Sequence, residues 1–155
     1  MYNGEWKDHK PHGNGFEKYE DGSSYRGQFN HGMKEGEGEF RWKDGSVFKG
    51  ELKNNNLHGK GYYIWSDGRE FNGRFENNKM NGHGVFTWPD GRKYTGDYQD
   101  DKKSGQGEYV WADGRRYKGE WKNGKQHGIG KYTNSSDVTR EGEWQNGKKI
   151  RWIEK

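Results

Sequence analysis

Six histidines are the residues best suited to metal chemistry in this 155-residue chain, which has no cysteine. His12, His58 and His127 each precede a glycine, but at least 46 residues separate any two of them. His9 and His12 offer two ligands at most, beside Pro11. A stable zinc site needs three or four such ligands in close geometry. We therefore expect no metal site, and no cofactor of any kind.

Two other patterns could serve catalysis, and neither has the context that catalysis needs. Gly-x-Gly pairs cradle phosphates where they open a helix after a strand, but here they recur six times inside strand-like sequence. Asp and Glu lie at turns or alternate outward along strands, without one convergent pair to act as acid and base. The sequence predicts that this chain is not an enzyme.

Basic residues form the strongest candidate for a binding site. Arg69, Arg92 and Arg115 follow successive Asp-Gly pairs, with Lys93 and Arg116 beside them. The net charge is only +4, from 28 basic and 24 acidic residues, so we expect no nucleic-acid partner. The row has two interpretations: a solvated edge with acidic neighbours, or a site for an anionic partner such as lipid headgroups or acidic protein tails.

The composition excludes a conventional layered core. Only 25% of the residues are hydrophobic, 16% are aromatic and 27 residues are glycine. Charged residues at 34% would suit a disordered chain, but eight Trp, ten Tyr and seven Phe do not. No apolar run approaches the roughly 20 residues of a spanning helix, and no signal peptide is apparent. With no cysteine, we expect a cytoplasmic protein whose buried surface is mostly aromatic.

A repeat of 23 residues organises the chain. A ring-x-Gly-x-apolar motif occurs six times in phase, and a degenerate copy follows at Arg140/Gly142/Trp144. The six motifs are Tyr2/Gly4/Trp6, Tyr25/Gly27/Phe29, Phe48/Gly50/Leu52, Phe71/Gly73/Phe75, Tyr94/Gly96/Tyr98 and Tyr117/Gly119/Trp121. The Gly-x-Gly pairs keep the same step, and so do five Asp-Gly pairs, each two residues after Tyr19, Trp42, Trp65, Trp88 or Trp111.

Each repeat contains two predicted turns. The first, at Asp8/His9 and its equivalents, suits a two-residue type I′ hairpin, which would set Gly4 opposite Gly13 and Tyr2 opposite Gly15. The second needs an odd number of residues to keep the motif rings on one face. A three-residue loop over 20–22, with its glycine in the left-handed conformation, would pair Gly27 with Gly15 and Phe29 with Gly13.

These turns predict an all-β fold: an elongated, single-layer antiparallel sheet, built as a meander of hairpin repeats and left open at its ends. Motif rings and motif glycines share one face, so that rings lie over bare backbone of the next strand. We expect the rings of the repeat core to be Tyr2, Trp6, Tyr25, Phe29, Trp42, Phe48, Trp65, Phe71, Phe75, Trp88, Tyr94, Tyr98, Trp111, Tyr117 and Trp121.

The repeated Tyr-x-Gly-x-Trp, Gly-x-Gly and Asp-Gly pattern closely resembles the MORN (membrane occupation and recognition nexus) repeat. The resemblance implies one array over residues 1–155, with six repeats over 2–139 and a degenerate seventh repeat and C-terminal cap over 140–155. It also implies scaffold roles in cytoskeletal, ciliary or axonemal assemblies, or in junctions. Some such arrays are accessory segments of lipid kinases or protein methyltransferases.

On the face away from the motif rings, Tyr62, Ile64, Val85 and Val110 interrupt an otherwise charged pattern. This apolar patch could accept a helix or an extended peptide, and the strand over 2–7 could pair with another chain. The leading hypothesis is a non-catalytic scaffold for protein–protein interaction. The alternatives are a peripheral module that binds anionic phospholipid, and the targeting segment of a larger lipid kinase or methyltransferase.

Overall fold

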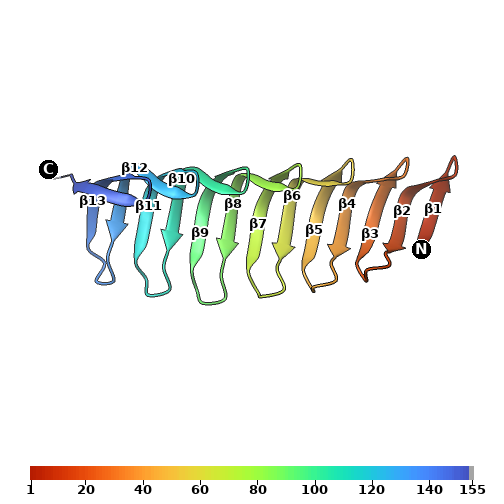
Figure 1. Ribbon diagram of the computed structural model, residues 1–155, viewed down its shortest axis with the longest axis horizontal. Coiled ribbons are helices and arrows are strands. Elements are labelled where there is room, and N and C mark those ends of the chain that lie inside the picture. Colours follow the sequence, from red (N-terminus) through yellow and green to blue (C-terminus); the bar gives the residue numbers. More distant parts are fainter. Residues whose placement is uncertain (154–155) are drawn as a thin grey trace. The chain divides into compact units, whose positions relative to one another are not determined.

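The computed structural model describes residues 1–153, which divide into two compact units. Figure 1 shows the strands of both units. Unit 1 is Met1–Lys79 and unit 2 is Met80–Lys155. The first seven strands are β1 (Tyr2–Lys7), β2 (Lys10–Lys18), β3 (Ser24–Asn30), β4 (Met33–Arg41), β5 (Val47–Lys53), β6 (Asn56–Ile64) and β7 (Glu70–Glu76). The next seven are β8 (Lys79–Thr87), β9 (Lys93–Gln99), β10 (Lys102–Val110), β11 (Arg116–Lys122), β12 (Lys125–Thr133), β13 (Thr139–Gln145) and β14 (Lys148–Trp152).

Within each unit, every strand pairs antiparallel with the strand that precedes or follows it in the chain. In unit 1 the pairs run from β1 with β2 to β6 with β7, and in unit 2 from β8 with β9 to β13 with β14. The residues described contain no helix. The predicted all-β meander of hairpins is confirmed.

The two-residue turns have the backbone that the sequence predicts. Asp8 and His9 have φ of 51° and 64°, and Asn54 and Asn55 have φ of 49° and 68°. Two successive residues with positive φ are the mark of a type I′ turn, which matches the twist of the flanking strands. Asn and Asp tolerate this conformation better than other non-glycine residues.

The register inside these hairpins differs from the prediction. Gly4 pairs with Gly15 rather than with Gly13, and Tyr2 pairs with Glu17 rather than with Gly15. The prediction was wrong because it carried the simple two-residue register along the whole hairpin. A bulge or register shift interrupts that pairing in every such hairpin that lies within one unit. The period of the sequence alone does not reveal it.

The bulge lies in the second strand of the hairpin. Trp6 pairs with Pro11 and Gly4 with Gly15, so residues 12–14 of β2 lie opposite residue 5 of β1. Gly13, inside the bulge, has φ of 75°, which a residue with a Cβ adopts only with strain. The first glycine of each Gly-x-Gly pair therefore makes the bulge, and the second stays in the ladder.

An acidic or amide side chain closes the bulge. The Asn14 backbone N–H donates to Glu5 Oε2 at 2.5 Å, and the Glu37 N–H donates to Gln28 Oε1 at 2.9 Å. Equivalent bonds join the Lys60 N–H to Glu51 and the Ile129 N–H to Glu120. The residue after the motif glycine thus satisfies a donor that the bulge removes from the ladder.

The three-residue loops follow the prediction. Gly15 pairs with Gly27 and Gly13 with Phe29, and Gly22 has φ of 95°. Asp21 Oδ1 accepts hydrogen bonds from the hydroxyl and the backbone N–H of Ser23. These two bonds lower the pKa of the Asp21 carboxyl. The Asp of each Asp-Gly pair therefore shapes the loop, and the Gly supplies its left-handed residue.

The second glycines of the Gly-x-Gly pairs and the motif glycines form one row across each unit. In unit 1 the row is Gly4, Gly15, Gly27, Gly38, Gly50, Gly61 and Gly73, each paired with the next. A Cβ placed on Gly38 would lie 2.6 Å from Cζ of Tyr25. The bare backbone is therefore the surface on which the motif rings rest.

The rings above this row pack edge to face, both within a repeat and between repeats. Tyr25 meets Phe29 at a centroid distance of 5.1 Å, and Tyr117 meets Trp144 of the following repeat at 4.8 Å. Such pairs add to the free energy gained from burying the rings. Five of the predicted core rings have no exposed surface: Tyr25, Phe48, Phe71, Tyr94 and Tyr117.

Side chains of the two-residue turns connect successive repeats. The Lys34 N–H donates to Asn55 Oδ1 and the Leu57 N–H donates to Asn78 Oδ1, both at 2.8 Å. In the reverse direction the Asn55 N–H donates to the carbonyl of Lys34 at 3.0 Å. Each turn is therefore bonded to the hairpin one repeat earlier.

The predicted core rings are not equally buried, because Tyr2, Trp6 and the four tryptophans Trp42, Trp65, Trp88 and Trp111 keep exposed surface. Trp6 is 59% exposed, because β1 has β2 as its strand neighbour and the Trp6 ring meets Tyr2 edge-on at 4.9 Å. In the degenerate seventh copy, the Arg140 guanidinium lies 4.2 Å from the centroid of the Trp152 ring. An arginine that stacks on Trp152 thus stands where the second to sixth repeats have a buried ring.

Replacing Gly38 with Ala should destabilise the fold, because the new Cβ overlaps the Tyr25 ring. The Gly38 φ is not in the left-handed region, so the effect is steric. Overpacking of this kind lowers the free energy of unfolding by about 1–3 kcal/mol, measurable by urea denaturation. Glu37→Ala, at the exposed neighbouring position on the opposite face, is the matched control. Equal stability of the two variants would contradict the role assigned to the glycine row.

Alkaline pH should unfold the chain through its buried phenols. Burial raises the pKa of Tyr25 and of Tyr117 from 10.0 to about 12, and it raises the pKa of Tyr94 further. Because the folded pKa exceeds the unfolded one, this stability is complete below about pH 10 and is lost as the pH rises through the folded value. As the pH increases, tyrosinate absorbance should therefore grow over the same pH range in which the circular dichroism signal of the fold is lost.

The matched control replaces these three tyrosines with Phe, the residue at the same repeat position in Phe48 and Phe71. The unfolding midpoint should move to higher pH in this variant. Titration of all the phenols near their ordinary pKa, with the fold retained, would show that burial does not hold them neutral.

Candidate functional site

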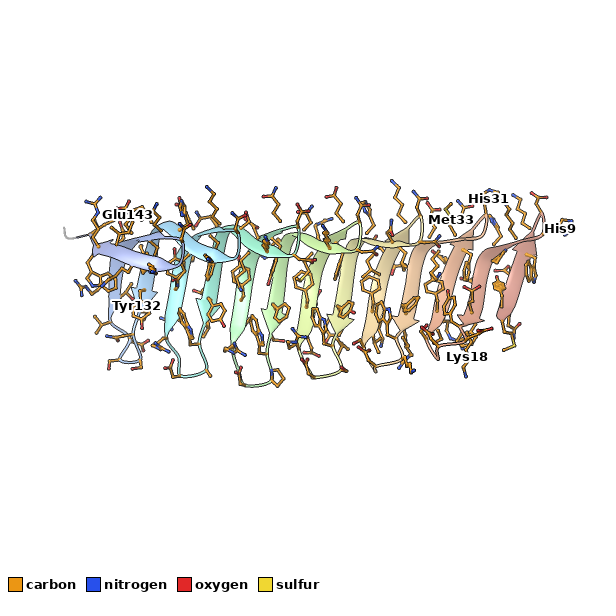
Figure 2. All side chains as sticks on the ribbon, in the orientation of Figure 1. His9, Lys18, His31, Met33, Tyr132 and Glu143 are labelled. Atoms are coloured by element: carbon orange, nitrogen blue, oxygen red, sulfur yellow. The ribbon has the colours of Figure 1, made fainter. Side chains whose placement is uncertain are left out.

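A second set of rings lies beside the buried core, and all but one of these rings keep some exposed surface. These rings come from the ends of the even-numbered strands and from the residue that precedes each three-residue loop. We call them the ring row. In unit 1 the ring row is Tyr19, Phe40, Trp42, Tyr63 and Trp65, and in unit 2 it is Phe86, Trp88, Tyr109, Trp111 and Tyr132. Figure 2 labels Tyr132 and shows the side chains along the strands.

Successive members of the ring row touch. Phe40 and Trp42 have centroids 4.6 Å apart, and Trp42 and Tyr63 have centroids 5.1 Å apart. In unit 2, Trp88 lies 5.7 Å from Tyr109. All members except the buried Phe86 are half-exposed. Each unit therefore presents a continuous aromatic strip, which is typical of surfaces that bind other proteins.

Two lysines insert their ammonium groups among the rings. Lys34 Nζ lies 5.2 Å from the Tyr19 centroid and 5.9 Å from that of Phe40. Lys103, at the same repeat position, lies 5.5 Å from Tyr109 and within 5.8 Å of three further rings, Trp88, Tyr94 and Trp121. Burial lowers the pKa of both ammonium groups. The sequence analysis missed these lysines. A signal was present, because Leu57 and Met80 occupy the same repeat position and a lysine is unexpected at a position that other repeats fill with an apolar residue.

A groove of about 280 Å³ opens beside Lys103 in unit 2. Three rings form its walls, Tyr109, Trp111 and Trp121. Gly124, Lys125, Gln126 and Gly147, from the two-residue turns and the start of β12, complete the lining. The groove therefore combines aromatic walls with two ammonium groups.

The predicted basic row is largely occupied by contacts within the chain. The Arg69 Nε–H donates to Asp67 Oδ2 at 2.8 Å, and its guanidinium lies 5.1 Å from the Trp65 centroid. Arg92 and Arg115 repeat this arrangement in unit 2 with Asp90/Trp88 and Asp113/Trp111. Arg116 lies 3.7 Å from the Asp137 carboxylate, and Lys93 is exposed. Each of the three turn arginines thus has a carboxylate partner and packs on a ring of the ring row.

The predicted apolar patch lies on the other face of the sheet, in two places. In unit 1, Tyr62 and Ile64 are half-buried on β6, and the Tyr62 hydroxyl donates to the Glu70 carboxylate. In unit 2, Val85 pairs with Thr95 and Val110 pairs with Lys93, and both valines are half-buried. Ile64 pairs with the apolar Val47 on one side, and within each unit the other strand partners of these four residues are polar or charged.

The histidines do not gather into a metal site in the part of the chain that the structure describes. His12 meets His31, a pair that the sequence analysis did not foresee, with ring centroids 5.2 Å apart. Figure 2 shows His9 and His31 at the turn end of the unit 1 hairpins. Within residues 1–153, no three His, Asp or Glu side chains are placed to hold a metal ion. The same residues include no helix long and apolar enough to cross a bilayer.

Comparison with solved structures finds matches at low identity. The TCP domain of SAS-4 (dCPAP) from Drosophila melanogaster, solved with a proline-rich motif of Ana2 (dSTIL), is 12% identical, covers 92% of this chain and 85% of its own, and gives a TM-score of 0.49. The TCP10 domain of Danio rerio CPAP is 14% identical over 92% of this chain and 73% of its own, with a TM-score of 0.35. At these values the likeness does not extend to function. No curated protein matches the sequence.

Comparison with protein families gives a match along most of the chain. The MORN repeat matches seven segments, at residues 2–24, 25–47, 48–68, 71–91, 94–115, 117–137 and 141–149. Their boundaries follow the 23-residue period, and each of the first six contains one ring-x-Gly-x-apolar motif. This chain belongs to the MORN repeat family.

Proposed function

We propose that this MORN-repeat chain is a non-catalytic scaffold that binds segments of other proteins along the ring row, within a cytoskeletal or ciliary assembly. The observation that carries the proposal is the half-exposed aromatic strip in each unit. Clustered aromatic rings with a polar rim are the features that concentrate binding free energy at protein interfaces. The charged turns on either side of the ring row provide such a rim.

The chemistry of the described residues favours binding over catalysis. Many acidic side chains have structural partners: they close bulges, shape loops or pair with arginines, as Glu5, Asp44 and Asp67 do. The half-exposed rings, by contrast, offer exposed aromatic surface to a ligand, next to the arginines that pack on Trp65, Trp88 and Trp111. A repeated surface of this kind suits docking of an extended or helical segment that contacts several repeats.

The alternative is a peripheral module that binds anionic phospholipid through the basic row. The contacts of Arg69, Arg92 and Arg115 favour the scaffold, because each guanidinium already has a carboxylate partner. A membrane surface would have to compete with these pairs. The role of the chain as a targeting segment of a larger enzyme stays a prediction.

Substitution of the ring row tests the scaffold. In Trp88→Asn/Trp111→Asn, both tryptophans take the residue that stands at the same repeat position in Asn134. We expect the wild type to retain defined partners from a lysate of its source cells, as read by cross-linking and mass spectrometry, and this variant to lose them. We expect this loss of partners because the Trp88 and Trp111 rings supply contact area that a bound partner would bury.

The control for this test is Lys118→Ala/Lys131→Ala, which removes two exposed charges from the opposite face of unit 2. It should keep the partners of the wild type, and circular dichroism should show that all three proteins are folded. Identical partners on the ring-row variant would contradict the proposal. A wild type that retains no partner would contradict it equally.

Liposome sedimentation tests the alternative. At low salt, we expect wild type and an Arg69→Glu/Arg92→Glu/Arg115→Glu variant to sediment equally poorly with phosphatidylserine vesicles, because the arginines are paired within the chain. Sedimentation of the wild type alone would instead favour the membrane function.

A further inference from the structure

The ammonium group of Lys103 has no carboxylate partner among the described residues. Its ammonium lies among four rings, and no Asp or Glu of residues 1–153 lies within ion-pair distance of it. Burial lowers the pKa of this lysine, and the nearby positive charge of Arg92 lowers it further. A partly desolvated ammonium without a counter-ion is unfavourable unless a ligand provides one.

The equivalent lysine in unit 1 shows what Lys103 lacks. Lys34 has the same repeat position and a similar set of rings, but its ammonium lies 4.0 Å from the Glu17 carboxylate. Three repeats later, the position of Glu17 is held by Phe86. The chain therefore contains one caged lysine with an internal counter-ion and one without.

The lysine without a counter-ion is the one that opens onto a groove. The groove of about 280 Å³ is lined by Lys103, Lys125, Gln126 and three half-buried or buried rings. None of the described lining residues is acidic. The rings can take an apolar side chain, the Gln126 amide can bond to a peptide backbone, and the two ammonium groups attract negative charge.

We propose that this groove binds an extended acidic segment of a partner protein, with an Asp or Glu side chain on the Lys103 ammonium and an adjacent apolar side chain against the rings. The inference rests on the proposed scaffold function and specifies the chemistry of one partner. Because no described carboxylate pairs with the Lys103 ammonium, we expect the ligand to supply one.

A carboxylate on a peptide suits this site better than a free or lipid-borne phosphate. A phosphate keeps much of its hydration and would have to give it up against ring faces, where few donors replace water. A side-chain carboxylate pairs with one ammonium, and its own chain carries the apolar groups that fill the rest of the groove. The groove therefore matches the mixed chemistry of a peptide.

A blocked peptide with alternating Leu and Glu, acetylated and amidated at its ends, tests the site with the full-length chain. Its only carboxylates are the Glu side chains. A charge-assisted contact of this kind is worth at least about tenfold in affinity. We expect the peptide to shift the indole N–H resonances of Trp111 and Trp121 in NMR spectra, and its Gln counterpart to bind at least about tenfold more weakly.

Two substitutions at Lys103 and one matched control locate the effect. Lys103→Met and Lys103→Gln introduce the residues found at the same repeat position in Met80 and Gln126, so both should fold. Each should weaken binding of the Glu peptide by at least about tenfold. Lys34→Met removes the lysine that already has a counter-ion, and it should leave the affinity unchanged.

Several results would overturn the inference. They are equal binding of the Glu and Gln peptides, full affinity in both Lys103 variants, absence of any binding, or inorganic phosphate shifting the same resonances at least as strongly as the peptide. If the peptide fails but the ring-row variant still loses its cellular partners, the scaffold stands and the acidic segment is wrong. If the peptide binds through Lys103 but no cellular partner is retained, the groove is supported and the scaffold is contradicted.

Discussion

Aromatic rings can be buried in a single layer of strands only where the strand beside them has no side chain in the way. In this chain the glycine row provides that space, and a Cβ on Gly38 would overlap the Tyr25 ring. The rings then pack edge to face from one repeat to the next, as Phe48 does with Phe75 at 5.3 Å. The other features of the repeat keep this arrangement in register.

The bulge is the feature that lets the glycine row exist. Without it, Gly4 would face Gly13, and the second glycine of the pair would move away from the motif glycine. The bulge takes up the extra residues of the even-numbered strand, and Glu5 or its equivalents bond to the N–H group that the bulge leaves free. Turn asparagines then join one repeat to the next. Each repeat thus depends on its neighbour for hydrogen bonds as well as for ring contacts.

Packing the buried rings on the glycine row also creates the surface that we assign to binding. Rings at the strand ends rest against the core, and all of them except Phe86 keep some exposed surface beside the arginines and lysines that pack on them. Small changes in sequence tune this surface from repeat to repeat. Where Glu17 is replaced by Phe86, a caged lysine loses its counter-ion and becomes a site for an external one. The repeat provides the scaffold, and departures from the repeat provide its chemistry.

The sequence by itself determined the period, the positions of both turns, the antiparallel meander and the face that carries the motif rings, because these follow from local backbone preferences and from side-chain alternation. It did not determine the hairpin register, because a bulge depends on which hydrogen bonds two strands can form together. Nor did it reveal that Arg69 is paired with Asp67 or that Lys103 lacks a carboxylate. The first depends on how the backbone of one loop folds around Asp67, and the second on which side chains meet across strands, and only the folded structure decides either.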